Sequence, residues 1–235
     1  MMPHAFPSQD LFSHLVGSAA RAVKMAEKEA PIVKRRFSAV GLSQIDYVRL
    51  VKVAALTHDI GKGADQYYQK PSIEIRESKQ GFTFNLHELP SAVIAERVCK
   101  NLVGIKEEES TIVFLAVLQH MSVLRDWLGS DIMVNSPQRW SFRIFGQQIC
   151  GFLRSELGVS IPLEVDRNEV SRRVRETQDK YLRDKSMYWP KLYSLVLAPV
   201  IVGDCIDAYN FRKNNVRGSR RQFTEELEVA LNERD

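Results

Sequence analysis

The chain has 235 residues, of which 44% are hydrophobic and 26% are charged, a composition that excludes a disordered or low-complexity chain and is typical of a globular protein. Its net charge of +4 permits an anionic partner without requiring one. The three cysteines, Cys99, Cys150 and Cys205, are far apart, which argues against a disulfide framework or a zinc ribbon and fits a reducing, cytoplasmic compartment.

The length suits one domain with a substantial core. We expect a single domain over residues 1–235, with a core at about 11–210 and a basic C-terminal extension at 211–235. The first residues show no signal-peptide pattern, and the longest apolar run, 192–202, is too short to span a bilayer. These features predict a soluble protein.

The first predicted element is an amphipathic helix from Asp10 onward, in which apolar residues recur at helical spacing and His14 lies near the start. We expect Pro31 to end this helix. Residues 1–10 are expected to form a short irregular lead.

The second predicted element, over residues 47–56, has almost no polar face and should therefore be a central, buried helix. Either Ser43 or Asp46 is its expected cap. Gly61 is a natural stop just past its end.

Alternating apolar residues in 73–84 predict a small β-hairpin that covers one side of a site. His87 follows, and Pro90 falls where the first turn of a new helix tolerates proline. The next helical segment, 111–121, is apolar almost throughout until it reaches His120. Two helices therefore carry or adjoin histidines.

In the second half of the chain, the aromatic residues of 140–145 are expected to be loop anchors or part of a short second hairpin. A helix should follow over 147–157. Residues 166–185 are strongly charged and favour an exposed helix, and the last core helix is expected over 192–209.

The segment 58–62, with the sequence HDIGK, lies at the end of the apolar central helix. His58 and Asp59 are costly to bury there and usually need a metal or a charged partner. The negative end of the helix macrodipole also favours a cation, and Lys62 can reach an anionic ligand such as a phosphate. Taken alone, the pair also fits an ordinary polar helix end.

Three further histidines and one further aspartate fall at or beside predicted core elements: His14, His87, His120 and Asp204. Any one of them is more often a hydrogen-bonded core residue than a ligand. Several helices that each deliver a nitrogen or oxygen ligand to a common centre are much rarer by accident. The whole set therefore predicts a metal site.

The order and local context of these residues resemble the HD superfamily of metal-dependent phosphohydrolases. The resemblance rests on five parts in this order: His14 followed by LVGSA, HDIGK at 58–62, HELPSA at 87–92, AVLQH at 116–120, and the Gly203 and Asp204 pair. More narrowly, the Gly-Lys after His-Asp and the His-Glu-x-x-Ser-Ala string resemble the HD nuclease of type I CRISPR interference, here as a stand-alone chain.

This resemblance implies an all-α fold, a helical bundle with one or two small β-hairpins, around a buried site for one or two metals. By position, the first metal would be held by His14, His58, Asp59 and Asp204, and the second by the bridging Asp59 with His87 and His120. Such mixed ligands suit Mn, Ni, Fe, Co or Zn, and Mg less well.

Asp59 and Lys62 are the catalytic residues that the resemblance implies. Two metals would polarise a phosphodiester and generate a hydroxide for in-line attack, and Lys62 would steady the transition-state phosphate. The CRISPR nucleases commonly carry two adjacent histidines where this chain has His120 followed by Met121, and a thioether is a poor ligand for these ions. Asp207, three residues after the last ligand, is the reserve candidate for the second site.

Basic residues without acidic neighbours follow the last core helix: Arg212, Lys213, Arg217, Arg220 and Arg221. Because this stretch continues from a ligand-bearing helix, it is suited to follow a nucleic-acid backbone towards the metals. An ordinary solvated surface is the alternative.

We therefore expect a metal-dependent nuclease that cleaves DNA, preferably single-stranded, in CRISPR interference and antiviral defence. The resemblance implies a separate helicase and an RNA-guided surveillance complex as partners. One alternative is an HD phosphohydrolase of nucleotides or small phosphate esters, for which the basic stretch would be dispensable. Another is a non-catalytic HD binding module, in which substituting His58 or Asp59 would disturb stability or binding but abolish no hydrolysis.

Overall fold

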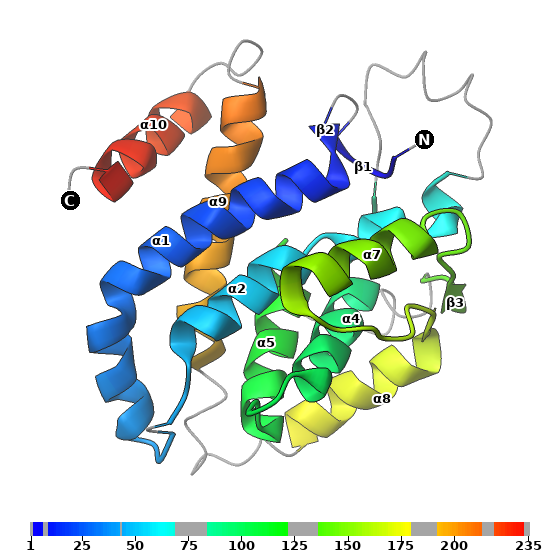
Figure 1. Ribbon diagram of the computed structural model, residues 1–235, viewed down its shortest axis with the longest axis horizontal. Coiled ribbons are helices and arrows are strands. Elements are labelled where there is room, and N and C mark those ends of the chain that lie inside the picture. Colours follow the sequence, from blue (N-terminus) through cyan, green and yellow to red (C-terminus); the bar gives the residue numbers. More distant parts are fainter. Residues whose placement is uncertain are drawn as a thin grey trace.

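In a computed structural model of the chain, the structure describes residues 2–6, 9–42, 44–68, 84–121, 136–179, 192–212 and 219–232. The α-helices of this part are α1 (Leu11–Ser38), α2 (Tyr47–Thr57), α4 (Glu88–Asn101), α5 (Glu107–Gln119), α7 (Gly146–Leu157), α8 (Arg167–Thr177), α9 (Tyr193–Arg212) and α10 (Ser219–Asn232) (Figure 1). Two short 3-10 helices, η1 (Ile60–Gly63) and η2 (Asp65–Tyr67), follow α2. The predicted all-α fold class is confirmed.

Helix α2 lies at the centre of the bundle, in contact with α1, α4, α5 and α9. Its residues are buried on almost every side, as its apolar sequence predicts. Asp46 caps the helix, because its side chain accepts a hydrogen bond from the backbone N–H of Arg49 at 3.1 Å. Ser43, the other expected cap, lies outside the described residues.

Helix α1 continues past Pro31 to Ser38, so the prediction that Pro31 ends this helix is wrong. Val33 and Phe37, one turn apart beyond the proline, are both buried in the core. Burial of two such side chains offsets the roughly 3 kcal/mol that an interior proline costs. The helix bends along its length (Figure 1), as the missing donor and the crowded carbonyl of an interior proline would cause.

The remaining helices surround this centre. Helix α9 packs along α1 and also touches α2 and α5, while α4 and α5 pack side by side and α8 lies against α4. Figure 1 shows α7 in front of α2 and α4, and α10 beside the end of α9. The helices expected over 147–157 and 192–209 are present as α7 and α9.

The two small sheets differ from the predicted hairpins. Strands β1 (His4–Phe6) and β2 (Gln9–Asp10) pair antiparallel where an irregular lead was expected. Strand β3 (Arg139–Trp140) pairs antiparallel with the distant β4 (Val165–Asp166), so residues 140–145 form no hairpin of their own. Within that stretch, the buried side chains of Trp140, Phe142 and Phe145 act as loop anchors. The hairpin predicted at 73–84 lies outside the described residues, apart from Phe84.

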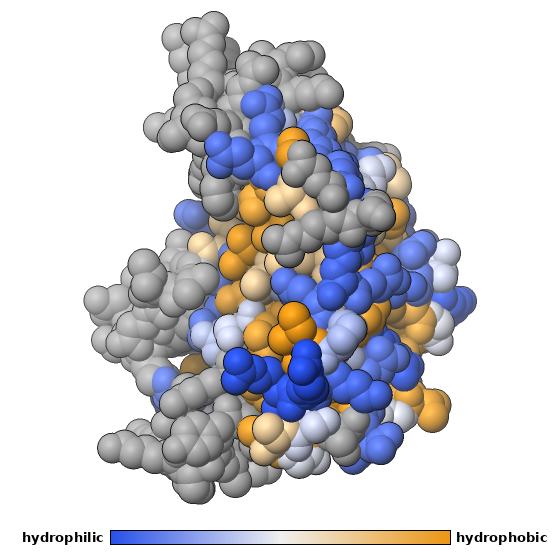
Figure 2. Space-filling view, turned by 90° about the vertical axis from the view of Figure 1, so that its left-hand side faces the viewer, coloured by the Kyte–Doolittle hydropathy of each residue, from blue (hydrophilic) through white to orange (hydrophobic). Residues whose placement is uncertain are grey.

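Among the described helices, α9 is long and apolar enough over Tyr193–Phe211 to cross a membrane. Length and composition are the only grounds for this, and a buried core helix has both. In the structure this helix packs against α1, α2 and α5 and carries two aspartates, Asp204 and Asp207. Figure 2, which views the side where α1 and α10 lie in Figure 1, shows hydrophilic residues mixed with hydrophobic ones over the described surface. A mixture of this kind is ordinary for a solvated protein surface.

Candidate metal centre

Six side chains from five helical segments converge at the centre of the bundle. They are His14 in α1, His58 at the end of α2, Asp59 just after it, His87 at the start of α4, His120 at the end of α5, and Asp204 in α9. Five of these residues are buried, and Asp204 is partly exposed. The structure therefore brings together every residue that the sequence predicts as a metal ligand.

Asp59 lies between two pairs of histidines. Its Oδ2 atom is 3.3 Å from His14 Nε2 and 3.6 Å from His58 Nε2. Its Oδ1 atom is 2.8 Å from His87 Nε2 and 3.3 Å from His120 Nε2. One carboxylate therefore has an oxygen facing each pair, which is the arrangement that a ligand shared between two ions requires.

Asp204 completes the first of these groups. Its Oδ1 atom lies 3.2 Å from His14 Nε2 and 3.9 Å from His58 Nε2. The preceding Gly203 lets α9 come this close to α1, because a Cβ atom at position 203 would lie 2.4 Å from the carbonyl oxygen of Ser18. The ligand atoms of His14, His58, Asp59 and Asp204 all lie within 4.8 Å of one another, and so do those of Asp59, His87 and His120.

Three of the histidines are held by backbone carbonyls. The Nδ1 atoms of His58, His87 and His120 lie 2.8, 2.6 and 2.7 Å from the carbonyl oxygens of the residues three positions earlier, Ala55, Phe84 and Val117. Because a carbonyl can only accept, each Nδ1 carries the hydrogen and donates it. In the neutral ring the Nε2 atom then offers a lone pair to the cluster.

Several atoms at the centre of the cluster have no hydrogen-bond partner, which tests whether the site fits a cation. These atoms are His14 Nε2, His58 Nε2 and Asp59 Oδ1. Asp59 Oδ1 is close to His87 Nε2, but in the neutral tautomer this contact sets two lone pairs against each other. Buried lone pairs without donors are costly, and a divalent cation satisfies them, because imidazole and carboxylate are ligands of Mn, Fe, Co, Ni and Zn. The residues present therefore fit a divalent metal.

The charge states of the cluster agree with this fit. Burial raises the pKa of Asp59, but the charge of Lys62 and the nearby histidines outweigh burial and hold that pKa well below its usual range. Burial lowers the pKa of His58 and keeps its ring neutral. Burial also acts to lower the pKa of His14, but the neighbouring carboxylates of Asp204, Asp207 and Asp59 raise it to about 11. The carboxylates around His14 therefore favour a positive charge at this point, which a proton or a bound cation can supply.

Lys62 lies beside this cluster on η1. Its Nζ atom is 2.5 Å from Asp59 Oδ2 and lies over two aromatic rings, 4.9 Å from the centroid of Phe6 and 5.6 Å from that of Phe84. The ammonium group is thus held next to the shared carboxylate by one ion pair and two cation–π contacts. Its role towards a phosphate remains a prediction.

The glycine of the HDIGK segment has a steric role. A Cβ atom at Gly61 would lie 2.0 Å from the carbonyl oxygen of His87. The backbone N–H of Gly61 also donates to Ser91 Oγ at 2.8 Å, and the Ser91 hydroxyl donates to the same His87 carbonyl at 2.8 Å. Gly61 and Ser91 therefore fix the segment that carries Asp59 against the start of α4.

Met121 and Asp207 were both considered in the sequence for the second group of ligands, which is Asp59, His87 and His120. Met121, which follows His120, is 53% exposed, so its thioether is not part of the buried cluster. Asp207, the reserve candidate, does not approach His87 or His120; its carboxylate instead lies 2.9 Å from Nδ1 of His14. Within the described residues, the second group thus consists of Asp59 and two histidines.

Sequence reasoning overlooked the residues that surround Asp207. Gln9, Gly17 and Arg21 all lie next to its carboxylate. The spacing of His14, Gly17 and Arg21 by three and four residues places them on one face of α1, and this was the signal that could have identified the group.

The predicted nucleic-acid residues cannot be placed in the same way. Arg212 ends α9, and Arg220 and Arg221 lie in the first turn of α10, but the side chains of all three lie outside the described part. Lys213 and Arg217 lie outside it entirely. Their contact with nucleic acid remains a prediction.

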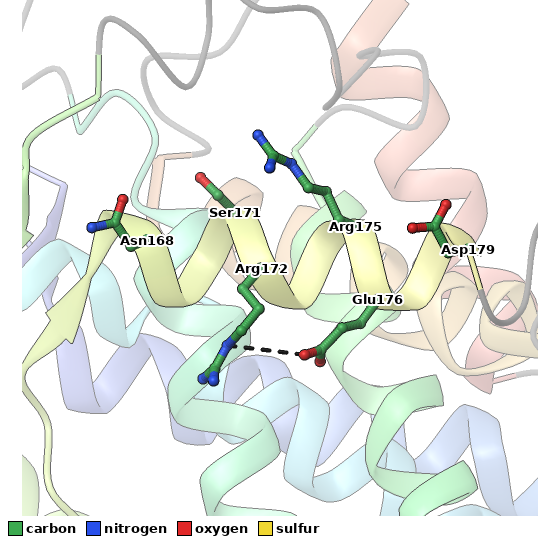
Figure 3. Close-up of a pocket in the computed structure, with 6 residues that line it drawn as sticks. All are labelled: Asn168, Ser171, Arg172, Arg175, Glu176 and Asp179. Carbon is green, nitrogen blue, oxygen red and sulfur yellow. Dashed lines mark ion pairs between the residues drawn. The ribbon is translucent and has the colours of Figure 1, made fainter.

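A hollow of about 760 Å³ lies on the surface of α8 (Figure 3). It is lined by Asn168, Ser171, Arg172, Arg175, Glu176 and Asp179. Figure 3 shows Arg172 turned towards Glu176, with which it forms an ion pair at 3.9 Å. The lining comes from α8 and the residues that directly follow it, and it contains none of the predicted metal ligands.

Two comparisons relate the chain to known proteins. Residues 11–129 match the HD domain family, and this range contains all the candidate ligands except Asp204. The CRISPR-associated endonuclease Cas3-HD of Saccharolobus solfataricus is 30% identical over 244 aligned residues, which cover 98% of this chain and 97% of the relative.

Proposed function

This chain belongs to the HD domain family of metal-dependent phosphohydrolases, and from that premise we propose that it is a nuclease that cleaves DNA phosphodiester bonds, with single-stranded DNA as the favoured substrate. The relative named as an endonuclease aligns over nearly its whole length, which supports a nucleic acid rather than a small phosphate ester as the substrate.

The observation that carries this proposal is the shared carboxylate of Asp59. Its two oxygens face two separate histidine pairs, and the cluster contains buried lone pairs that only a cation or a proton can satisfy. Phosphodiester hydrolysis at paired ions needs such a bridge, because the ions must lie close enough to act on one phosphate.

The residues have distinct tasks in the proposed reaction. His14, His58, Asp59 and Asp204 would hold one divalent ion, and Asp59, His87 and His120 a second, and these ions would supply Lewis-acid chemistry to the phosphodiester. The backbone carbonyls keep three imidazoles turned with Nε2 inward, so little reorganisation is needed on binding. Lys62 presents an ammonium group beside Asp59, where it can stabilise the negative charge of the phosphate.

The cellular setting belongs to the same proposal. We propose that the chain acts in the cytoplasm in CRISPR interference and antiviral defence, together with a separate helicase and an RNA-guided surveillance complex. The name of the relative supports the CRISPR setting.

The first experiment is degradation of single-stranded and duplex DNA of the same sequence by the purified chain, with Mn, Co, Ni or Mg added after chelation. We expect cleavage only with metal, faster on the single strand. Cleavage should be lost in Asp59→Asn and retained in Asp179→Asn, which changes an exposed aspartate just after α8 in the same way.

Two results would contradict the nuclease. DNA that stays intact under every metal, while a nucleotide or a generic phosphodiester is hydrolysed, would favour a phosphohydrolase of small substrates. No hydrolysis of any substrate would favour a non-catalytic module, and adding the helicase partner would distinguish that module from a nuclease that depends on it.

A second experiment tests the substrate through the basic stretch. Substituting Arg217, Arg220 and Arg221 together by glutamine should weaken single-stranded DNA binding. A plot of the logarithm of the binding constant against the logarithm of the salt concentration should also become less steep, by about 0.7 for each phosphate that the variant no longer neutralises. Hydrolysis of a small generic phosphodiester should be unchanged. Unchanged DNA binding would leave the basic stretch as a solvated surface.

A further inference from the structure

The Nδ1 atom of His14 has a different kind of partner from those of the other three histidines. His58, His87 and His120 lie at helix ends, where a carbonyl three residues earlier is free to accept from Nδ1. His14 is the fourth residue of α1, where the neighbouring carbonyls are used by the helix itself. A side chain from another helix must therefore accept its Nδ1 hydrogen.

Asp207 of α9 is that acceptor. Its Oδ2 atom lies 2.9 Å from His14 Nδ1, and the same carboxylate is buried. Asp204, one turn earlier on α9, lies 3.2 Å from the opposite nitrogen, Nε2. One helix thus contacts both nitrogens of the His14 ring, with one aspartate at the metal side and the other behind it.

The Asp207 carboxylate is itself held in place. Gln9 Nε2 donates to Oδ2 at 2.8 Å, and Arg21 Nη1 donates to Oδ1 at 3.0 Å. The same Arg21 nitrogen donates to the carbonyl oxygen of Gly17 at 2.8 Å. A carboxylate fixed at both oxygens can fix the ring that it contacts.

Gly17 provides the space that this arrangement needs. A Cβ atom at position 17 would lie 2.0 Å from Asp207 Oδ1 and 2.8 Å from its carboxyl carbon. Any other residue would displace the carboxylate from His14. Glycine is otherwise unfavourable inside a helix by about 1 kcal/mol relative to alanine, so its presence in α1 is explained by this contact.

We infer that Asp207 is a positioning residue of the metal centre: it accepts the Nδ1 hydrogen of His14, turns Nε2 towards the metal and makes that nitrogen a stronger ligand. Gln9, Arg21 and Gly17 hold Asp207 for this task. The inference rests on the proposed metal centre but not on the identity of the substrate.

Metal affinity is the direct test, because it does not depend on DNA cleavage. Titration of Co²⁺ into the metal-free protein, followed by calorimetry and by the visible absorption of the bound ion, should show affinity about 10-fold to 100-fold weaker in Asp207→Asn than in the wild type. Asparagine keeps the shape and one acceptor oxygen but removes the charge.

A double-mutant cycle separates positioning from general stability. If Asp207 acts through His14, then Asp207→Asn should change Co²⁺ affinity less than about twofold when His14 is already alanine. A merely structural role would weaken binding equally in both backgrounds.

A second variant, Gly17→Ala, allows the same test if Asp207→Asn does not fold. Gly17→Ala should displace the carboxylate without removing it and should weaken Co²⁺ binding in the same direction. Gly151→Ala in α7 is the matched control, since a Cβ atom there would meet nothing within 4 Å, and its Co²⁺ affinity should equal that of the wild type.

The inference is overturned if folded Asp207→Asn and Gly17→Ala both bind Co²⁺ as tightly as the wild type. It stands, and the nuclease proposal falls, if the wild type binds Co²⁺, the two variants bind it weakly, and no DNA is cleaved even when the helicase partner is added.

Discussion

Among the described residues, a partly buried polar cluster around Arg173 and the buried cluster around Asp59 differ in how their charges are matched. Arg173 of α8 donates to Glu96 at 2.6 Å, to Glu107 at 3.1 Å and to the Thr111 hydroxyl at 2.9 Å, so donors and acceptors are paired. The cluster around Asp59 gathers lone pairs instead and leaves three buried atoms without hydrogen-bond partners. The donors and acceptors of the first cluster satisfy one another, whereas the second cluster needs added positive charge, from a cation or a proton.

The comparison distinguishes a structural polar cluster from a functional one. Breaking the Arg173 cluster should reduce the free energy of unfolding without affecting metal binding. Changing the Asp59 cluster should abolish metal-dependent behaviour at a smaller cost to the metal-free protein.

The largest effect is expected for Asp59→Asn. Both histidine pairs lose their shared anionic ligand, so the rate of metal-dependent DNA cleavage should fall on the order of 10³-fold, equivalent to about 4 kcal/mol. Single-turnover cleavage of labelled single-stranded DNA measures this. A loss smaller than tenfold would show that Asp59 does not bridge the two groups.

Glu96→Gln should reduce the stability of the fold and leave metal binding unchanged. Removing the charge of the buried Glu96 carboxylate from the partly buried Arg173 guanidinium should lower the free energy of unfolding by roughly 3 kcal/mol, the lower end for a broken buried pair, because Glu107 remains. Urea unfolding in the presence of a chelator measures the change. Glu164→Gln, in an exposed pair with Arg139, is the control and should change stability little. A weakened Co²⁺ affinity in Glu96→Gln would contradict the contrast.

Metal addition should stabilise the folded wild type by binding to the Asp59 cluster. At a metal concentration about 100 times Kd, the gain is about 2.7 kcal/mol, which raises Tm by about 5–10 °C for a chain of this size. This rise should disappear in His58→Ala and persist in Glu96→Gln. Thermal unfolding with and without a chelator gives both values, and an equal rise in the two variants would mean that the metal binds elsewhere.

The smallest effect concerns a carboxylate that is satisfied without any cation. Asp65 accepts from the Ser141 hydroxyl at 2.6 Å and from the backbone N–H groups of Arg143 and Ile144 at 3.0 and 2.9 Å. Although burial acts to raise its pKa, these hydrogen bonds lower it below the usual value. Asp65→Asn should therefore cost about 1.5 kcal/mol at neutral pH.

The pH dependence of this effect has a definite sign. Because the pKa of Asp65 is lower in the folded state, its contribution is fully present above the unfolded value of about 3.9 and is lost as the pH falls through the folded value. The difference in unfolding free energy between wild type and Asp65→Asn should be constant above about pH 5 and shrink below about pH 4. A difference that grows on acidification would contradict this assignment.

Much of the fold follows from local sequence pattern. Helix α2 was predictable because a segment without a polar face can only be stable when it is surrounded. The predicted ligands could be identified because polar residues that are costly to bury interrupt apolar segments. The prediction that α1 ends at Pro31 was wrong because it considered only the low helix propensity of proline. The burial of Val33 and Phe37 in the core outweighs that propensity. The β3–β4 pair joins segments too distant in sequence for local pattern to connect.

The sequence by itself determined the helical class, the position of the central helix and the set of residues suited to bind a metal. These properties depend on hydrophobic periodicity and on the cost of burying polar groups, and both can be evaluated within short segments. The tertiary structure alone decided that Asp59 faces two histidine pairs, that Asp207 lies behind His14 and that Gly17 makes room for it. The contacts of Asp207 with His14 and Gly17 depend on how α1 and α9 cross, and this crossing is determined by packing between residues almost 200 positions apart.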